Sequence, residues 1–190
     1  VNGTTVNLLG AGATSFLGDV TSNVVFGAGA STTGTATVAA NKKIVGAVTT
    51  TDTGEGTLTF AVATSDTTLA SSTIGATDAV LKAVNIVVTD ADTTDSIGVA
   101  ATMAGNIFAT GVNATATLAT DAEGDGDTVA FSGTVDATTL TLTGDGSFTF
   151  ADTVTATTVL VDDSIVTVAA NKGFVGAVQN KNDEGTIAFA

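Results

Sequence analysis

Internal repetition is the feature of this sequence that most constrains its fold. Residues 38–48 (VAANKKIVGAV) recur as residues 168–178 (VAANKGFVGAV), and residues 55–61 (EGTLTFA) recur as residues 184–190 (EGTIAFA). The second copy therefore follows the first at a distance of about 130 residues, with one loop residue deleted between the two matched stretches. A chain that repeats its own segments is expected to stack similar structural units on one another.

A shorter repeat lies inside the long one. Residues 131–142 (FSGTVDATTLTL) are followed, 19 residues later, by residues 150–161 (FADTVTATTVLV), and their apolar positions stay in register. We therefore expect equivalent apolar side chains to stack inside the core. The predicted stacked pairs are Phe131 with Phe150 and Val135 with Val154.

A five-residue element, with apolar residues at both ends and Gly at its centre, also recurs along the chain. It begins at Phe16, Ile44, Met103, Phe131 and Phe174; residues 150–154 match it with Asp in place of Gly, and Ile74 is expected to begin one further unit. The spacing of these starts indicates a repeating unit of 19 to about 30 residues.

Each unit contains two or three short runs of apolar and β-branched residues, separated by Gly, Asp, Asn and Ser. Such runs are typical of strands, and the residues between them are typical of turns. The sequence therefore predicts an all-β fold, a parallel β-helix (β-solenoid) whose coils stack about 4.8 Å apart. The alternative is an antiparallel β-sandwich, which the in-register repetition of one turn chemistry disfavours. Residues 77–84 are the one segment that could form a helix.

Most of the side chains used in catalysis are absent from this sequence. It has no His, Cys, Tyr, Trp, Arg or Pro, so it lacks the imidazole base, the thiol nucleophile and the usual transition-metal ligands. Carboxylate pairs can hydrolyse glycosides, but neighbours such as Asp162 and Asp163 point to opposite faces of a strand unless they lie in a turn. We therefore expect that the chain is not an enzyme, with a carboxylate glycosidase on a β-helix as the remaining catalytic alternative.

The charge balance limits the partners of the chain. Five basic and 19 acidic residues give a formal net charge of −14, so nucleic acids and anionic membranes are expected to repel it. Favoured partners are cations, basic surfaces and further copies of the chain. No segment approaches the ~18 unbroken apolar residues of a membrane helix, and the chain is not expected to span a membrane.

Two acidic segments are candidate Ca²⁺ sites, because Ca²⁺ prefers oxygen ligands on a flexible loop. In the stronger candidate, alternate acids lie in a Gly-containing run (residues 121–127, DAEGDGD). Ser132 stands where an EF-hand would need an acid, so a simpler Ca²⁺ clip is expected. The candidate ligands are Asp121, Glu123, Asp125 and Asp127, with Asp90, Asp92 and Asp95 as a weaker second set. Beyond Ca²⁺, no cofactor is expected.

Residues 44–48 (IVGAV) and 52–60 (DTGEGTLTF) resemble segments of the passenger domains of bacterial autotransporters, above all the large rickettsial outer-membrane surface antigens. The resemblance covers nearly the whole chain in composition, since such passengers are Cys-free, rich in Thr, Gly and Asn, and β-helical. It implies an extracellular location on a bacterial cell surface. Residues 1–190 are then expected to form a single domain of β-repeats, as a fragment or processed subunit of a larger surface protein.

The first and last strand-like runs, residues 4–9 and 185–190, are apolar and uncharged. Such edges template further strands unless a charged element covers them. We therefore expect self-assembly through the ends of the chain, by way of Val6, Leu8, Ile187 and Phe189. The alternative is that the coils that continue the stack belong to the same longer polypeptide. The expected function is a structural component of a cell-surface layer (S-layer) or extracellular filament. The alternative is an adhesin that binds host or neighbouring cells.

Overall fold

The structure of the chain is a computed structural model, and it describes residues 1–27, 34–63, 66–89, 99–116, 126–181 and 185–190. These residues form strands joined by turns, and no helix occurs among them. The strands are β1 (Thr5–Leu8), β2 (Ala13–Phe16), β3 (Asn23–Phe26), β4 (Thr35–Val38), β5 (Val48–Thr50), β6 (Glu55–Val62), β7 (Thr67–Ala70), β8 (Leu81–Val88), β9 (Ala100–Met103), β10 (Ile107–Ala116), β11 (Thr128–Phe131), β12 (Val135–Thr143), β13 (Ser147–Phe150), β14 (Val154–Val161), β15 (Ile165–Val168), β16 (Phe174–Val175), β17 (Val178–Asn180) and β18 (Thr186–Phe189).

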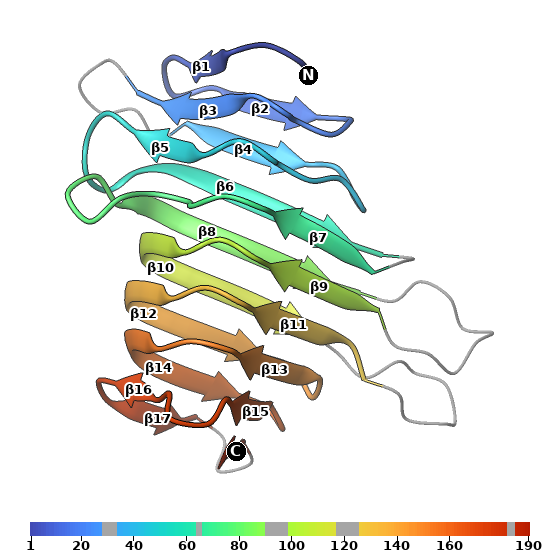
Figure 1. The fold of residues 1–190 in the computed structure, drawn as a ribbon, viewed down its shortest axis with the longest axis vertical. Coiled ribbons are helices and arrows are strands. Elements are labelled where there is room, and N and C mark those ends of the chain that lie inside the picture. The colour runs from blue at the N-terminus through green and yellow to red at the C-terminus, as the bar shows by residue number, and fades with distance from the viewer. Residues whose placement is uncertain (28–33, 64–65, 90–98, 117–125, 182–184) are drawn as a thin grey trace.

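The strands form three parallel sheets. A nine-stranded major sheet has the order β16-β14-β12-β10-β8-β6-β4-β2, with β17 also paired to β14; a six-stranded minor sheet has the order β18-β15-β13-β11-β9-β7; and β1, β3 and β5 form a third sheet. The chain alternates between the major sheet and a second sheet, which is the third sheet for β2 to β5 and the minor sheet from β6 onward, with β16 and β17 both pairing with β14 of the major sheet near the C-terminus. We call each passage through the major sheet and then the second sheet a level. Figure 1 shows the strands stacked along the long axis of the molecule, from β1 and β2 at one end to β16, β17 and the C-terminus at the other.

This architecture confirms the prediction of an all-β fold with parallel sheets, and it is consistent with a parallel β-helix. Every pairing between named strands is parallel in the part of the chain that the structure describes, which differs from the antiparallel pairing of the alternative sandwich. The helix considered for residues 77–84 is wrong. That segment is a turn leading into β8, because Val84, Ile86 and Val88 alternate at the spacing of a strand and all three are buried.

Parallel pairing in register arranges the core as columns of side chains. Residues that pair from level to level share a face, so each apolar side chain lies over its counterpart. One column contains Val24, Val48, Ile74, Ile107, Val135 and Val154, all buried. A second contains Ala70, Met103, Phe131, Phe150 and Val168, also buried. The predicted pairs are confirmed: Val135 pairs with Val154, and the Phe131 and Phe150 rings stack with centroids 4.7 Å apart.

The five-residue element forms the corner between the two columns, but it does so at only some of the expected places. Ile44, Met103 and Phe131 begin this corner, whereas Phe16 pairs with Val38 in the major sheet and Phe174 pairs with Val154. The unit expected to begin at Ile74 begins instead at Ala70 and ends at Ile74. The pairings show this, because Ala70 pairs with Met103 and Ile74 with Ile107.

At Gly105 and Gly133 the central Gly of the element is required by close approach between neighbouring levels. A Cβ added at Gly133 would lie 2.7 Å from the carbonyl carbon of Gly105 and 2.6 Å from Oδ1 of Asn106. Gly105 lies in the same way against the backbone of Ser72. A side chain at these positions would therefore push successive levels apart.

The two copies of the long repeat have the same local turn but lie in different sheets. Asn41 and Asn171 both have positive φ, 57° and 61°, in a turn where Lys42 N–H donates to Ala39 C=O and Lys172 N–H donates to Ala169 C=O, each at 3.1 Å. Val38, before the first turn, belongs to β4 of the major sheet, whereas Val168 belongs to β15 of the minor sheet. The local sequence therefore sets the conformation of the turn, while strand pairing decides which sheet the preceding strand joins.

We predict that Phe131→Ala and Phe150→Ala each lower the free energy of unfolding by about 3–5 kcal/mol, because each removes a buried ring from a column that cannot collapse. The double variant should lose less free energy of unfolding than the sum of the two single losses, since the rings contact each other. Urea unfolding followed by circular dichroism measures this.

Phe189→Ala is the matched control, because Phe189 continues the same column after Val168 but is 62% exposed. It should cost less than about 1 kcal/mol. Equal losses at the three positions would contradict the column arrangement.

Candidate self-assembly surfaces

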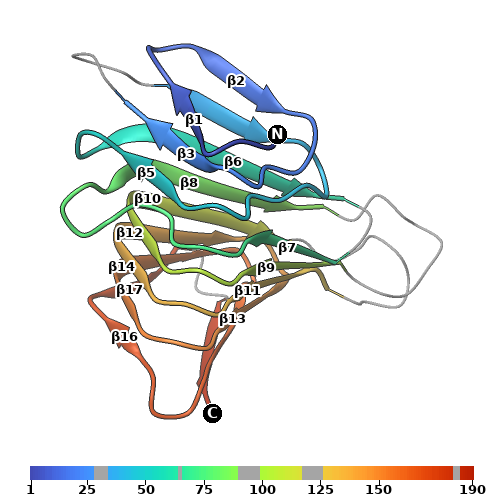
Figure 2. The same ribbon diagram turned by 45° about the horizontal axis from the view of Figure 1, so that its top comes forward.

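The two ends of the stack present edge strands. β1 and β2 lie at one end, where their pairings are to β3 and β4; β16, β17 and β18 lie at the other, where their pairings are to β14 and β15. Figure 2 shows the first of these ends turned toward the viewer. None of these five strands contains a charged residue. Charge, which proteins use to block pairing at such edges, is therefore missing from the edge strands themselves.

The structure places the residues predicted for self-assembly on these edge strands. Val6 and Leu8 on β1 and Ile187 on β18 are half-buried and packed against the core, and Phe189 on β18 is 62% exposed. The structure brings Val6 together with Leu8, and Ile187 together with Phe189, at opposite ends of the stack.

Sequence reasoning missed further exposed apolar side chains at the same ends. Leu9 and Leu17 flank the first edge strands and are 70% and 81% exposed, while Val175 and Val178 in the last level are 59% and 46% exposed. Val178 could have been found from the pairing of β14, since it lies opposite Thr158 in a column that is buried in the preceding levels. Both ends therefore combine unpaired strand edges with exposed apolar side chains.

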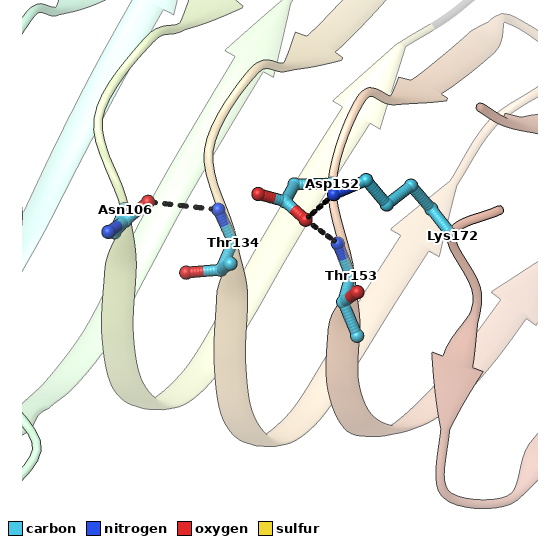
Figure 3. Close-up of polar contacts among 5 residues, drawn as sticks. All are labelled: Asn106, Thr134, Asp152, Thr153 and Lys172. Atoms are coloured by element: carbon cyan, nitrogen blue, oxygen red, sulfur yellow. Dashed lines mark hydrogen bonds and ion pairs between the residues drawn. The ribbon is translucent and has the colours of Figure 1, made fainter. Parts of the chain in front are cut away.

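A polar corner links neighbouring levels where the backbone ladder is interrupted (Figure 3). Thr134 N–H donates to Oδ1 of Asn106 at 3.0 Å, so the amide stands in for a backbone carbonyl. In the next level, Oδ1 of Asp152 accepts from Thr153 N–H at 2.8 Å and from Nζ of Lys172 at 2.7 Å. The bond from Lys172, followed by that from Thr153, holds the pKa of the Asp152 carboxyl below its ordinary value.

The candidate Ca²⁺ ligands lie largely outside the described residues. This holds for Asp121, Glu123 and Asp125, and also for Asp90, Asp92 and Asp95. Asp127 is described: it is fully buried, and its Oδ1 accepts from Val99 N–H at 3.0 Å, which ties it to the level before. Within the described ranges no group of three or more His, Cys, Asp or Glu side chains is arranged to hold a metal ion. The Ca²⁺ site therefore remains a prediction.

The Asp162–Asp163 pair lies in the bend that joins β14 to β15. Both residues are exposed, and Asp162 has a positive φ of 62°. The pair therefore occupies an outer turn of the stack, which is where a solvated acidic turn is expected.

The outer face of the major sheet carries hydroxyl and amide side chains in rows. One row runs through Thr37, Thr59, Asn85, Asn113, Thr141 and Val159. Nδ2 of Asn113 donates to Oδ1 of Asn85 at 2.9 Å, and Nδ2 of Asn85 donates to Oγ1 of Thr59 at 3.3 Å. We call this surface, formed by the outward residues of β4, β6, β8, β10, β12 and β14, the Thr/Asn face.

In comparisons with known proteins, no family model, no curated protein and no solved structure matches this chain. Among the described residues, no helix is long and apolar enough to cross a membrane.

We predict that Lys172→Met raises the pKa of Asp152 toward its ordinary value, because the variant removes the main hydrogen bond to the carboxylate. NMR titration of the Asp152 carboxyl carbon measures this. Since folding lowers this pKa, the contact contributes stability above the ordinary pKa and loses it as the pH falls through the lowered value. The contribution is expected to be small because both side chains are more than a third exposed.

Lys42→Met is the matched control, because Lys42 occupies the same turn position in the first copy of the repeat. It should leave the pKa of Asp152 where it is. A shift of equal size in both variants would point to the overall charge of the protein instead of the direct contact.

Proposed function

We propose that this chain is a non-catalytic structural component of a bacterial cell-surface layer or extracellular filament, and that it self-assembles end to end as a parallel β-helix. The observation that carries the proposal is the surface that each end of the stack exposes. Both have uncharged edge strands, and both expose apolar side chains that would be buried if the stack continued.

The β-helix supplies the geometry for such assembly. Val6 pairs with Val24 at the start of the first column, and Phe174 pairs with Val154 at its end. If the stack continues from one copy to the next, Val6 of the following copy takes the place opposite Phe174. The contact is heterologous, since it joins two different surfaces, and heterologous contacts that do not close produce filaments.

The absence of His, Cys, Tyr and Arg from the sequence supports a structural role, because few groups remain for chemistry. The resemblance of residues 44–60 to autotransporter passengers supports an extracellular location. A host-binding adhesin on the same fold would act as isolated rods, so the state of assembly separates the two functions.

We predict that the purified chain forms concentration-dependent oligomers, and that Val178→Glu weakens them by placing a charge on the last edge of the stack. Sedimentation velocity over a concentration series, with negative-stain images of the largest species, measures this. Val45→Glu is the matched control: it adds the same charge at a side chain of similar exposure, 37% against 46%, but in the corner between β4 and β5, whose neighbour Ile44 is paired on both sides.

A protein that stays monomeric at high concentration, with and without Ca²⁺, would rule out assembly through the ends. Isolated rods that bind to cells would favour the adhesin. Equal weakening by both Glu variants would assign the effect to net charge.

We also propose that Ca²⁺ binds through Asp121, Glu123 and Asp125, with Asp127 at the end of the same run. We predict that Ca²⁺ raises the melting temperature relative to chelator, because a ligand that binds only the folded state stabilises it, by about 2.7 kcal/mol at a hundred times its Kd. Differential scanning calorimetry measures the shift.

The triple variant Asp121→Asn, Glu123→Gln and Asp125→Asn should abolish the shift, whereas the same exchange at Asp90, Asp92 and Asp95 should leave it in place. Both variants remove three charges, so they control for net charge. Equal melting temperatures of the unmodified chain with Ca²⁺ and with chelator would contradict the Ca²⁺ proposal.

A further inference from the structure

We propose that the Thr/Asn face is a lateral interface through which two copies of this chain pack face to face. This contact is separate from the end-to-end contact and does not depend on it. Together the two contacts would pair two filaments face to face.

The first argument is the distribution of charge. The chain has a formal net charge of −14, so two copies repel each other over most of their surface. On the six strands of the Thr/Asn face the charged residues are Glu55, Lys82 and Asp136, and all three lie in the first two positions of their strands. The remainder of the face therefore lets a second copy approach without opposing carboxylates.

The second argument is size. Six strands about 4.8 Å apart, with about six charge-free residues each at about 3.3 Å, give a flat area of roughly 500 Å² before side-chain relief is counted. Standard interfaces bury about 800 Å² per partner, so this face suits a weak contact that repetition along a filament would reinforce. Strands of the minor sheet are four residues long, about 13 Å, and offer a narrower surface.

The third argument is the chemistry of the face. Its Thr, Asn, Ala and Val side chains offer methyl groups and neutral hydrogen-bonding groups. The rings on these six strands are those of Phe60, which is buried, and Phe108, which is half-buried in the second position of β10, so the central part of the face has no aromatic ring to stack on a sugar. The natural complement of a flat, neutral sheet face is another such face, since sheets pack together at about 10 Å.

The fourth argument is preorganisation. The hydrogen bonds from Asn113 to Asn85 and from Asn85 to Thr59 already fix these side chains in the single copy. Less side-chain freedom is then lost on association than for an unordered polar surface. A contact between identical faces is isologous and closes as a two-fold dimer.

The test uses the Val178→Glu chain, in which end-to-end contact is suppressed, so that lateral association is measured alone. Sedimentation velocity should show a monomer–dimer equilibrium that strengthens as salt is raised, because salt screens the repulsion between acidic copies. Thr141→Glu and Thr141→Lys, in the polar row of the face on β12, should each weaken the dimer about tenfold or more, since each buries an unpaired charge in the interface.

Thr149→Glu and Thr149→Lys are the matched controls. Thr149 lies on β13 in the same level, is similarly half-buried and faces outward from the minor sheet. These variants should leave the dimer unchanged, and circular dichroism should show the same folded signal in all four proteins.

Several outcomes would overturn the proposal: a monomer at every concentration and salt level, a dimer that both Thr141 variants retain, or weakening by the Thr149 variants instead. Opposite effects of Glu and Lys at Thr141 would show that net charge, and not contact through this face, controls association. If Thr141→Glu does not fold, the Lys variant and its Thr149 counterpart decide the result. Loss of filaments in Val178→Glu tests only the end-to-end contact, and the Thr141 variants test only the lateral contact. Either proposal can therefore be contradicted without the other.

Discussion

The parallel pairing of each strand with its counterpart in the next level is the interaction on which the rest of this structure depends. It places equivalent side chains over one another, so that β-branched residues such as Val24 and Val48 form one continuous column of the core, and Phe131 and Phe150 stack in another. It also satisfies the backbone between levels instead of within them. Where the ladder breaks at a corner, Asn106 supplies the missing acceptor from its side chain.

Each level satisfies the backbone hydrogen bonds and covers the apolar side chains of the next. The first and last levels therefore each lack a partner on one side. This explains why Val178 and Phe189, which continue buried columns into the last level, are exposed, while the middle of the stack buries the same columns. The proposed end-to-end assembly extends the same pairing beyond one chain, and it needs no chemistry other than that of the core. The proposed lateral contact uses the other surface that repetition creates, a neutral sheet face.

The acidic residues that the structure describes lie mainly away from these two surfaces, the ends of the stack and the neutral sheet face. Described acids such as Asp52, Asp78 and Asp163 lie in turns and are exposed, whereas Asp127 is buried and bonded to the neighbouring level. Charge in the turns keeps an otherwise neutral rod apart from its copies by repulsion. Association then becomes sensitive to salt and to any cation that binds the acidic turns.

The sequence by itself determined the strand content, the parallel stacking and the pairing of Phe131 with Phe150, because these depend on alternation and on a short period with loops of equal length. It also determined the turn at Asn41 and Asn171, which local backbone preference sets. Only the tertiary structure decided that these two turns lie in different sheets and that Ala70, instead of Ile74, begins its corner. Loops of unequal length hide the register between levels, and register is set by which distant strands pair. The exposure of Val178 and the neutral Thr/Asn face likewise follow from pairing across levels, which no single stretch of sequence contains.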